Sequence, residues 1–297
     1  MITPSYLKKG DSIGIIAPAR KISLSEIQFA VDVIKSWGLK VVFGKNLFKE
    51  QNQFSGSDKE RTDDLQTMMD DDSIRAIISA RGGYGTLRIV DKINFSKFQK
   101  KPKWIIGYSD ITVLHSHIHT NFDIETIHAA MPISFQKDTE SVESLRKILF
   151  KKKLSYKISS HKLNRKGKAE GIIVGGNLSV LYALQGSKSD IDTKGKILFI
   201  EDLDEYFYHI DRMMLSLKRA GKLSHLAGLI VGKMSNMKDN EVPFGKTAEE
   251  IIYESVSEFN YPVCFNFPSG HDQKNLALLF GRRAKLMVEQ NTALAYF

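Results

Sequence analysis

Short apolar runs alternate with amphipathic segments along the first half of the chain. The apolar runs, each short enough for a buried strand, lie at residues 12–17, 40–44, 74–80 and 104–107. Helical spacing of apolar residues occurs between them, at residues 23–37, 58–69 and 86–93. Strands that alternate with helices are typical of an α/β fold with a largely parallel sheet. In such a sheet, ligands bind beyond the carboxyl ends of the strands.

The second half of the chain lacks this regular alternation. Strand-like runs lie at residues 171–174, 197–200, 226–231, 262–265, 286–288 and 293–297, with helical patterns at 206–220 and 247–259. A basic stretch at residues 151–168 separates the halves and is typical of a solvated connector. We therefore predict an N-terminal α/β domain at 1–150, a linker at 151–168, and a smaller, β-rich α/β domain at 169–297.

Composition excludes several classes of protein. Hydrophobic content of 42% and charged content of 26% are ordinary for a soluble globular chain. The net charge of +9 is spread along the chain and accompanies no nucleic-acid-binding motif, so no nucleic acid partner is predicted. No apolar run is long enough to span a bilayer, and the first ten residues lack the apolar core of a secretory signal. The lone Cys264 lies in an apolar run and fits a reducing compartment, so we predict a cytoplasmic protein without a membrane partner.

The segment Gly-Tyr-Ser-Asp at 107–110 ends one predicted strand and opens a helical pattern. A serine at a sharp strand-to-helix turn exposes its hydroxyl at the sheet edge, beside the amides of the new helix. Those amides could stabilise an oxyanion, so Ser109 is a candidate nucleophile. The alternative is that Ser109 or Asp110 only caps the helix.

Two other predicted loops carry chemistry. Arg-Gly-Gly-Tyr-Gly at 81–85 follows a strand, and its glycines permit a close approach of backbone to a ligand, although a plain tight turn explains them equally well. His271 follows a Pro-Ser-Gly turn after another strand, where a general base could lie or where a surface histidine would be unremarkable.

Acidic side chains follow the predicted strand at 197–200. Glu201 ends the strand, which is a suitable position for a carboxylate that orients a histidine. Glu205 lies four residues further on, and helix capping is the alternative role for the acids of this group.

His115 and His119 share one face of the helix predicted after Ser109. Their spacing is compatible with zinc, but no carboxylate third ligand is apparent nearby. We predict a structural role for both residues and no metal site.

Several motifs together resemble the LD-carboxypeptidase family of serine peptidases, which includes muramoyl-tetrapeptide carboxypeptidases and microcin-immunity peptidases. The motifs are GDSIGIIAP at 10–18, ARGGYG at 80–85, IGYSDIT at 106–112, GGNL at 175–178, LFIED at 198–202, IDR at 210–212 and PSGH at 268–271. They extend over nearly the whole chain. The segment HAAMP at 128–132 departs from the family, which usually has His-Gly-Pro there.

The resemblance implies a catalytic triad of Ser109, Glu201 and His271. It also implies an oxyanion hole formed by the backbone amides of Asp110 and Gly83. Asn177 would lie near the substrate, and Arg81 is a candidate for binding the terminal carboxylate of a peptide. A Rossmann-like domain packed on a smaller β-rich domain, a homodimer, and chemistry without a cofactor are further expectations from the family.

The favoured hypothesis is a serine LD-carboxypeptidase that releases terminal D-alanine from murein tetrapeptide during peptidoglycan recycling. One alternative is a peptidase of the same family that detoxifies peptidyl-nucleotide antibiotics. The other is a non-catalytic module that binds a peptide or sugar, with Ser109 as a helix cap.

Overall fold

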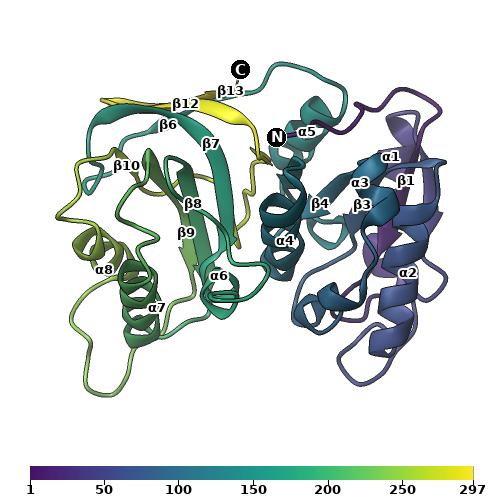
Figure 1. The fold of residues 1–297 in the computed structure, drawn as a ribbon, viewed down its shortest axis with the longest axis horizontal. Coiled ribbons are helices and arrows are strands. Elements are labelled where there is room, and N and C mark those ends of the chain that lie inside the picture. Colours follow the sequence, from purple (N-terminus) through teal and green to yellow (C-terminus); the bar gives the residue numbers. More distant parts are fainter. Residues whose placement is uncertain (297) are drawn as a thin grey trace.

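The computed structural model describes residues 1–296 and contains two β-sheets with their covering helices (Figure 1). The first sheet has the order β2-β1-β3-β4-β5-β11, and all neighbours are parallel except β11 with β5. Its strands are β1 (Ser12–Ile16), β2 (Lys40–Phe43), β3 (Ile74–Ser79), β4 (Trp104–Gly107), β5 (Thr126–His128) and β11 (Leu278–Phe280). The predicted α/β class with a parallel N-terminal sheet is confirmed.

Five α-helices belong to this first domain. They are α1 (Leu24–Ser36), α2 (Asp58–Asp70), α3 (Ser96–Lys100), α4 (Thr112–Phe122) and α5 (Thr139–Leu149). α1 buries the apolar stripe that its spacing predicts, and α2 begins with a capping box in which Ser57 and Glu60 bond reciprocally. The helix predicted at 86–93 is wrong: this segment forms two short 3₁₀ helices, Thr86–Arg88 and Val90–Lys92. A segment this short cannot offset the cost of nucleating an α-helix without help from packing.

The second sheet is mixed, with the order β10-β9-β8-β7-β12-β13-β6. Its strands are β6 (Ser155–Ser159), β7 (Gly167–Asn177), β8 (Ile197–Leu203), β9 (Gly228–Ser235), β10 (Val263–Cys264), β12 (Arg283–Val288) and β13 (Asn291–Tyr296). The accompanying helices are α6 (Leu178–Ala183), α7 (Phe207–Arg219) and α8 (Ala248–Ser255). The long strand β7 joins the two parts of this sheet, because its first half pairs with β12 and its second half with β8. Phe297, the end of the last predicted strand, lies outside the described residues.

Two segments depart from the predicted division of the chain. The predicted linker at 151–168 contains β6, which pairs with β13, and also the first residues of β7. The strand β11, which belongs by sequence to the second domain, pairs with β5 of the first sheet. Both pairings join residues more than 100 positions apart, and a local hydrophobic pattern carries no information about such partners.

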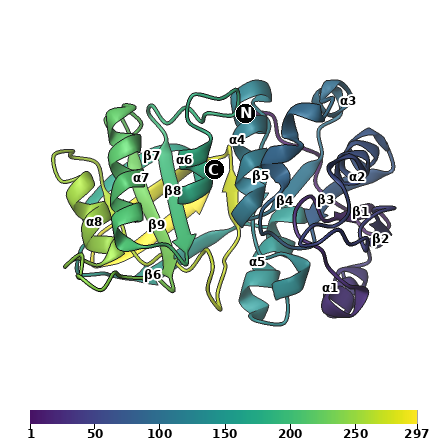
Figure 2. The same ribbon diagram turned by 90° about the horizontal axis from the view of Figure 1, so that it is seen from below.

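Helix α4 lies between the two domains (Figure 1, Figure 2). All its residues from Thr112 to His119 are buried, because one side packs on the first sheet and another faces β7 and α6. The hydroxyl of Thr112 accepts a hydrogen bond from the backbone N–H of Asn177 at 3.0 Å, across the domain boundary. The start of α4 is therefore fixed against the carboxyl end of β7.

Candidate active site

Ser109 lies in a strained turn between β4 and α4. Its φ angle is 64°, in the left-handed region that costs an L-residue roughly 1–2 kcal/mol. Strain of this kind persists where surrounding structure enforces it, commonly at functional sites. A Cβ atom added to Gly82 would lie 2.8 Å from Cβ and 2.9 Å from Oγ of Ser109, so only glycine lets this backbone pack against the serine. The structure thus brings Ser109 and the loop at 81–85 together.

Two buried charged side chains, Asp110 and Arg61, form hydrogen bonds with the backbone at the end of the loop at 81–85. The Asp110 carboxylate accepts a hydrogen bond from the N–H of Thr86 at 2.8 Å. The Arg61 guanidinium donates to the carbonyl oxygens of Pro18 at 2.5 Å and Gly85 at 3.0 Å. Nothing in the pattern of residues 58–69 distinguishes Arg61 from its charged neighbours, so the sequence had no signal for this contact. The backbone N–H of Asp110 lies in the first turn after Tyr108, where N–H groups have no partner within the helix.

His271 and Glu201 form a hydrogen-bonded pair. The His271 Nδ1 atom lies 2.7 Å from Oε2 of Glu201, and the His271 backbone N–H donates to the same oxygen at 3.2 Å. Glu201 is fully buried within β8, which continues to Leu203, so the acid does not end its strand as predicted. Gly270 has a φ angle of 120°, and a Cβ atom there would lie 2.8 Å from the carboxylate. A glycine before His271 is therefore required for this loop to reach Glu201.

The His271 loop also contacts the serine turn. The ring of His271 lies 4.8 Å from the ring of Tyr108, the residue that precedes Ser109. From the other side, the first turns of α5 support the loop, since Ser141 and Ser144 hydroxyls accept from the N–H groups of Asn275 and Ala277 at 2.8 and 2.9 Å. The two domains thus bring the serine turn and the histidine loop to one place.

Glu205 has a different partner. Its carboxylate lies 2.5 Å from Nδ1 of His209, four residues along the chain at the start of α7. Of the two acids that the sequence left open, only Glu201 bonds His271.

Asn177 is buried, and its side-chain hydrogen bonds lie within the protein. Its amide nitrogen donates to Asp202 at 2.8 Å, and its amide oxygen accepts from the N–H of Val180 at 3.2 Å, which caps α6. Asp202 is nearly inaccessible, and burial together with the neighbouring Glu201 charge raises its pKa to about 7. A contact between Asn177 and substrate stays a prediction.

Arg81 points toward the first domain's own loops. Its guanidinium donates to the carbonyl oxygen of Lys21 at 3.2 Å and lies 3.9 Å from the Glu26 carboxylate. These contacts secure the loop at 81–85 against the start of α1. Neither of these contacts supports the predicted role of Arg81 in binding a substrate carboxylate.

The remaining candidate groups are separately engaged. His115 Nε2 bonds the Gly107 carbonyl oxygen and His119 Nε2 bonds the Thr126 hydroxyl, each at 2.9 Å. Burial lowers the pKa of His115 to about 4, so its ring stays neutral. Burial also raises the pKa of Cys264 to about 12, which keeps that thiol protonated and a poor nucleophile. Within residues 1–296, no group of three His, Cys, Asp or Glu side chains could hold a metal ion.

We expect chelators to leave activity unchanged. One ring nitrogen of each of His115 and His119 bonds a neighbouring protein group. These two nitrogens therefore stabilise α4 and do not act as a pair of metal ligands. Turnover measured before and after dialysis against EDTA should agree within error. Loss of activity that zinc restores would contradict this expectation.

The pH dependence of kcat/KM should report the ionisation of His271. Burial lowers the pKa of this ring, but the charge and hydrogen bond of Glu201, with a contribution from Asp202, raise it more, so the net pKa lies above 6.5. A general base must be neutral, so kcat/KM should fall as the pH drops through that raised pKa. A pH–rate profile tests this, and an acidic limb centred below 6.5 would contradict it.

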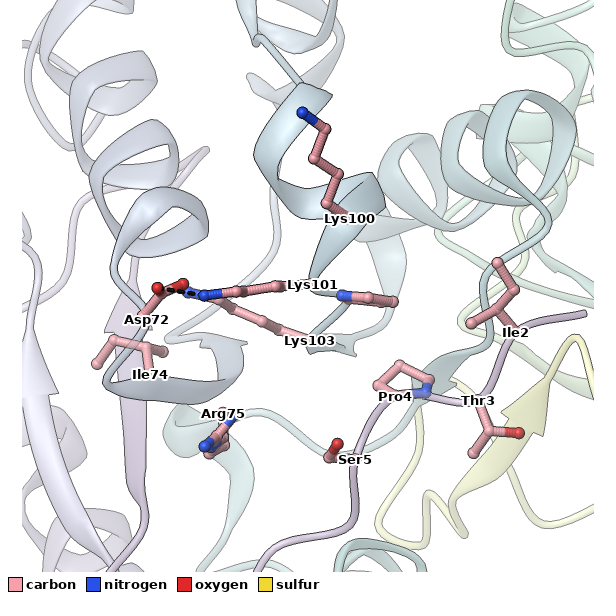
Figure 3. Close-up of a pocket in the computed structure, with 11 residues that line it drawn as sticks. Ile2, Thr3, Pro4, Ser5, Asp72, Ile74, Arg75, Lys100, Lys101 and Lys103 are labelled. Carbon is pink, nitrogen blue, oxygen red and sulfur yellow. Dashed lines mark hydrogen bonds and ion pairs between the residues drawn. The ribbon is translucent and has the colours of Figure 1, made fainter.

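A cavity of about 520 Å³ lies at the opposite edge of the first sheet (Figure 3). It is lined by the N-terminal segment, the start of β3 and the residues before β4. Its lysines are partly engaged, since Lys101 pairs with Asp72 at 2.5 Å and Lys103 donates to carbonyl oxygens at the end of α2. No residue of the predicted triad lines it, so the candidate active site lies elsewhere.

The largely parallel sheet, the serine turn at its carboxyl edge and the adjacent His–Glu pair define the class of an α/β serine hydrolase. The LD-carboxypeptidase N-terminal domain matches residues 13–129, and the LD-carboxypeptidase C-terminal domain matches residues 170–286. The chain belongs to the LD-carboxypeptidase family, and it is a serine-type carboxypeptidase.

Relatives with carboxypeptidase names align with almost the whole chain. The chain is 37% identical to a probable murein peptide carboxypeptidase of Bacillus subtilis (strain 168), over 98% of this chain and 93% of the relative. It is 25% identical to a murein tetrapeptide carboxypeptidase of Pseudomonas aeruginosa, over 92% of each chain.

Solved structures have the same architecture. The muramoyltetrapeptide carboxypeptidase of Oxalobacter formigenes superposes with a TM-score of 0.86 at 27% identity, over 96% of this chain and 98% of that one. The microcin C7 self-immunity protein MccF superposes with a TM-score of 0.90 at 24% identity, over 100% and 99% of the two chains, which shows a shared fold. No helix among residues 1–296 has the length and apolar character of a membrane span.

Proposed function

We propose that this carboxypeptidase releases the terminal D-alanine of murein tetrapeptide by hydrolysing the L,D-amide bond. The observation that carries the proposal is the buried Glu201 bonded to His271 beside the strained turn of Ser109. The names of the relatives from Bacillus subtilis, Pseudomonas aeruginosa and Oxalobacter formigenes support a murein peptide as the substrate.

In the proposed mechanism, Ser109 Oγ attacks the scissile carbonyl carbon while His271 accepts the hydroxyl proton. Glu201 holds the imidazole in the productive tautomer and stabilises the imidazolium ion. The backbone amides of Asp110 and Gly83 donate to the tetrahedral oxyanion. His271 then protonates the amine of D-alanine as the C–N bond breaks, and water hydrolyses the acyl-enzyme by the same steps.

The assay that tests this function measures free D-alanine after incubation of the protein with murein tetrapeptide. We expect stoichiometric release of D-alanine and a tripeptide product, detected by mass spectrometry. An L,L-tetrapeptide with terminal L-alanine serves as the matched control and should remain intact. Hydrolysis of an aminoacyl sulfamoyl nucleoside with no hydrolysis of the murein peptide would favour the antibiotic-directed alternative instead.

We also propose that the protein acts in the cytoplasm as a homodimer. The single buried cysteine is compatible with a reducing compartment, and dimerisation follows from the family resemblance. Light scattering coupled to size-exclusion chromatography distinguishes a dimer from a monomer of 33.6 kDa.

A further inference from the structure

His271 borders a polar cavity of about 450 Å³ that both domains line. The second domain contributes the end of β9, the start of α8 and the His271 loop, and the first domain contributes Lys137, in the loop before α5. The lining residues are Lys137, Gly232, Lys233, Met234, Ser235, Asn236, Glu249, Asn266, His271, Asp272 and Gln273. The cavity is therefore adjacent to the base of the proposed reaction and contains positive charge.

The chemistry of a carboxypeptidase specifies what must bind on this side. The base protonates the leaving amine, so the departing D-alanine lies beside the histidine when the C–N bond breaks. The carboxylate carbon of that residue is two bonds from the leaving nitrogen, a distance of about 2.5 Å. A cation that binds the terminal carboxylate must consequently lie close to His271.

Two candidate cations, Arg81 of the loop at 81–85 and Lys233 of the cavity, are engaged with other groups. Arg81 bonds the carbonyl oxygen of Lys21. The Lys233 ammonium donates to Asn266 Oδ1 at 2.7 Å and lies 3.4 Å from the Asp272 carboxylate.

Lys137 is the remaining cation of the cavity. No acidic side chain among residues 1–296 lies within ion-pairing distance of it. The backbone N–H of Lys137 donates a hydrogen bond to the Ser134 carbonyl oxygen at 3.0 Å, which fixes the backbone, and its side chain is exposed. Burial lowers the pKa of His271, and the Glu201 and Asp202 charges raise it. The Lys137 charge also lowers this pKa, so its ammonium group is near enough to His271 to act on it.

We propose that Lys137 binds the terminal carboxylate of the peptide substrate in the cavity beside His271. The proposal rests on the proposed carboxypeptidase function and identifies the residue that distinguishes a free carboxyl end from an internal peptide bond. Neither acidic residue of the cavity pairs with Lys137, because Asp272 is paired with Lys233 and Glu249, on α8, lies beyond ion-pairing distance of Lys137.

The test compares murein tetrapeptide with its C-terminal amide, which lacks the negative charge. We expect Lys137→Met to lower kcat/KM for the free acid about ten- to a hundredfold, mainly through KM, as loss of a charge-assisted hydrogen bond predicts. The amide should be cleaved equally by both proteins, so the preference for the acid disappears. Lys147→Met, which removes the same charge from the exposed end of α5, is the matched control and should retain the preference.

Calorimetry with the inactive Ser109→Ala protein provides a second measurement that does not require turnover. Adding Lys137→Met should weaken binding of the acid about ten- to a hundredfold and leave binding of the amide unchanged. An equal effect on both peptides, or no effect on either, would overturn the assignment of Lys137. Failure of the wild type to cleave either peptide would reject the proposed function separately, since the binding comparison still decides the role of Lys137.

Discussion

Ser109→Ala is expected to abolish peptide hydrolysis, with a loss in kcat on the order of 10⁶, as for the nucleophile of a well-studied serine peptidase. The hydroxyl is the only group of this side chain that the proposed reaction uses, and the alanine retains the Cβ atom that packs against Gly82. Circular dichroism and thermal melts should therefore match the wild type. Release of D-alanine at the parental rate would show that Ser109 is not the nucleophile.

Ser109→Gly separates the strain at this position from its chemistry. Glycine adopts a φ angle of 64° without the Cβ penalty, so this variant should be inactive yet more stable than the wild type. We expect the free energy of unfolding to rise by about 0.5–1 kcal/mol, because relief of strain exceeds the added entropy of the unfolded chain. Denaturant titration of Ser109→Gly and the wild type measures this difference in unfolding free energy. Equal stability would mean that the serine does not strain the turn.

Glu201→Gln is expected to lower kcat by about 10⁴, the loss seen when the acid of a well-studied triad becomes an amide. The neutral amide cannot stabilise the imidazolium ion, and it allows the wrong tautomer of His271. The fold should persist because the amide has the same shape and can still bond the ring of His271 from its buried position in β8.

Glu205→Gln is the matched control, with the same chemical change four residues away. Glu205 pairs with His209 on the partly exposed start of α7, and such pairs contribute about 0.3–0.5 kcal/mol. We expect a slightly lower melting temperature and most of the wild-type rate. Steady-state kinetics and melts of both variants decide the assignment, and a reversed pattern would make Glu205 the acid of the triad.

The local pattern of the sequence contained most of the fold. The alternation of short apolar runs with helical spacing predicts the parallel sheet of the first domain, since burial of each element depends mainly on its own residues. It also predicts a sharp turn at Ser109, an acid, Glu201, at the end of a strand at 197–200, and a histidine in a loop after a strand. The structure confirms the turn at Ser109 and the loop position of His271, whereas β8 continues two residues past Glu201 to Leu203, so the acid lies inside its strand.

Tertiary contacts decided which of these groups meet. Glu201 and Glu205 are equally acidic and four residues apart, but only the buried one reaches His271, because Gly270 allows the loop to approach β8. The pairing of β11 with β5 and of β6 with β13 likewise depends on partners more than 100 residues away. The sequence alone determined the class of each element and the chemical types at its ends. Only the packed structure determined partners, because hydrophobic periodicity records how deeply a residue is buried and not which residue it is buried against.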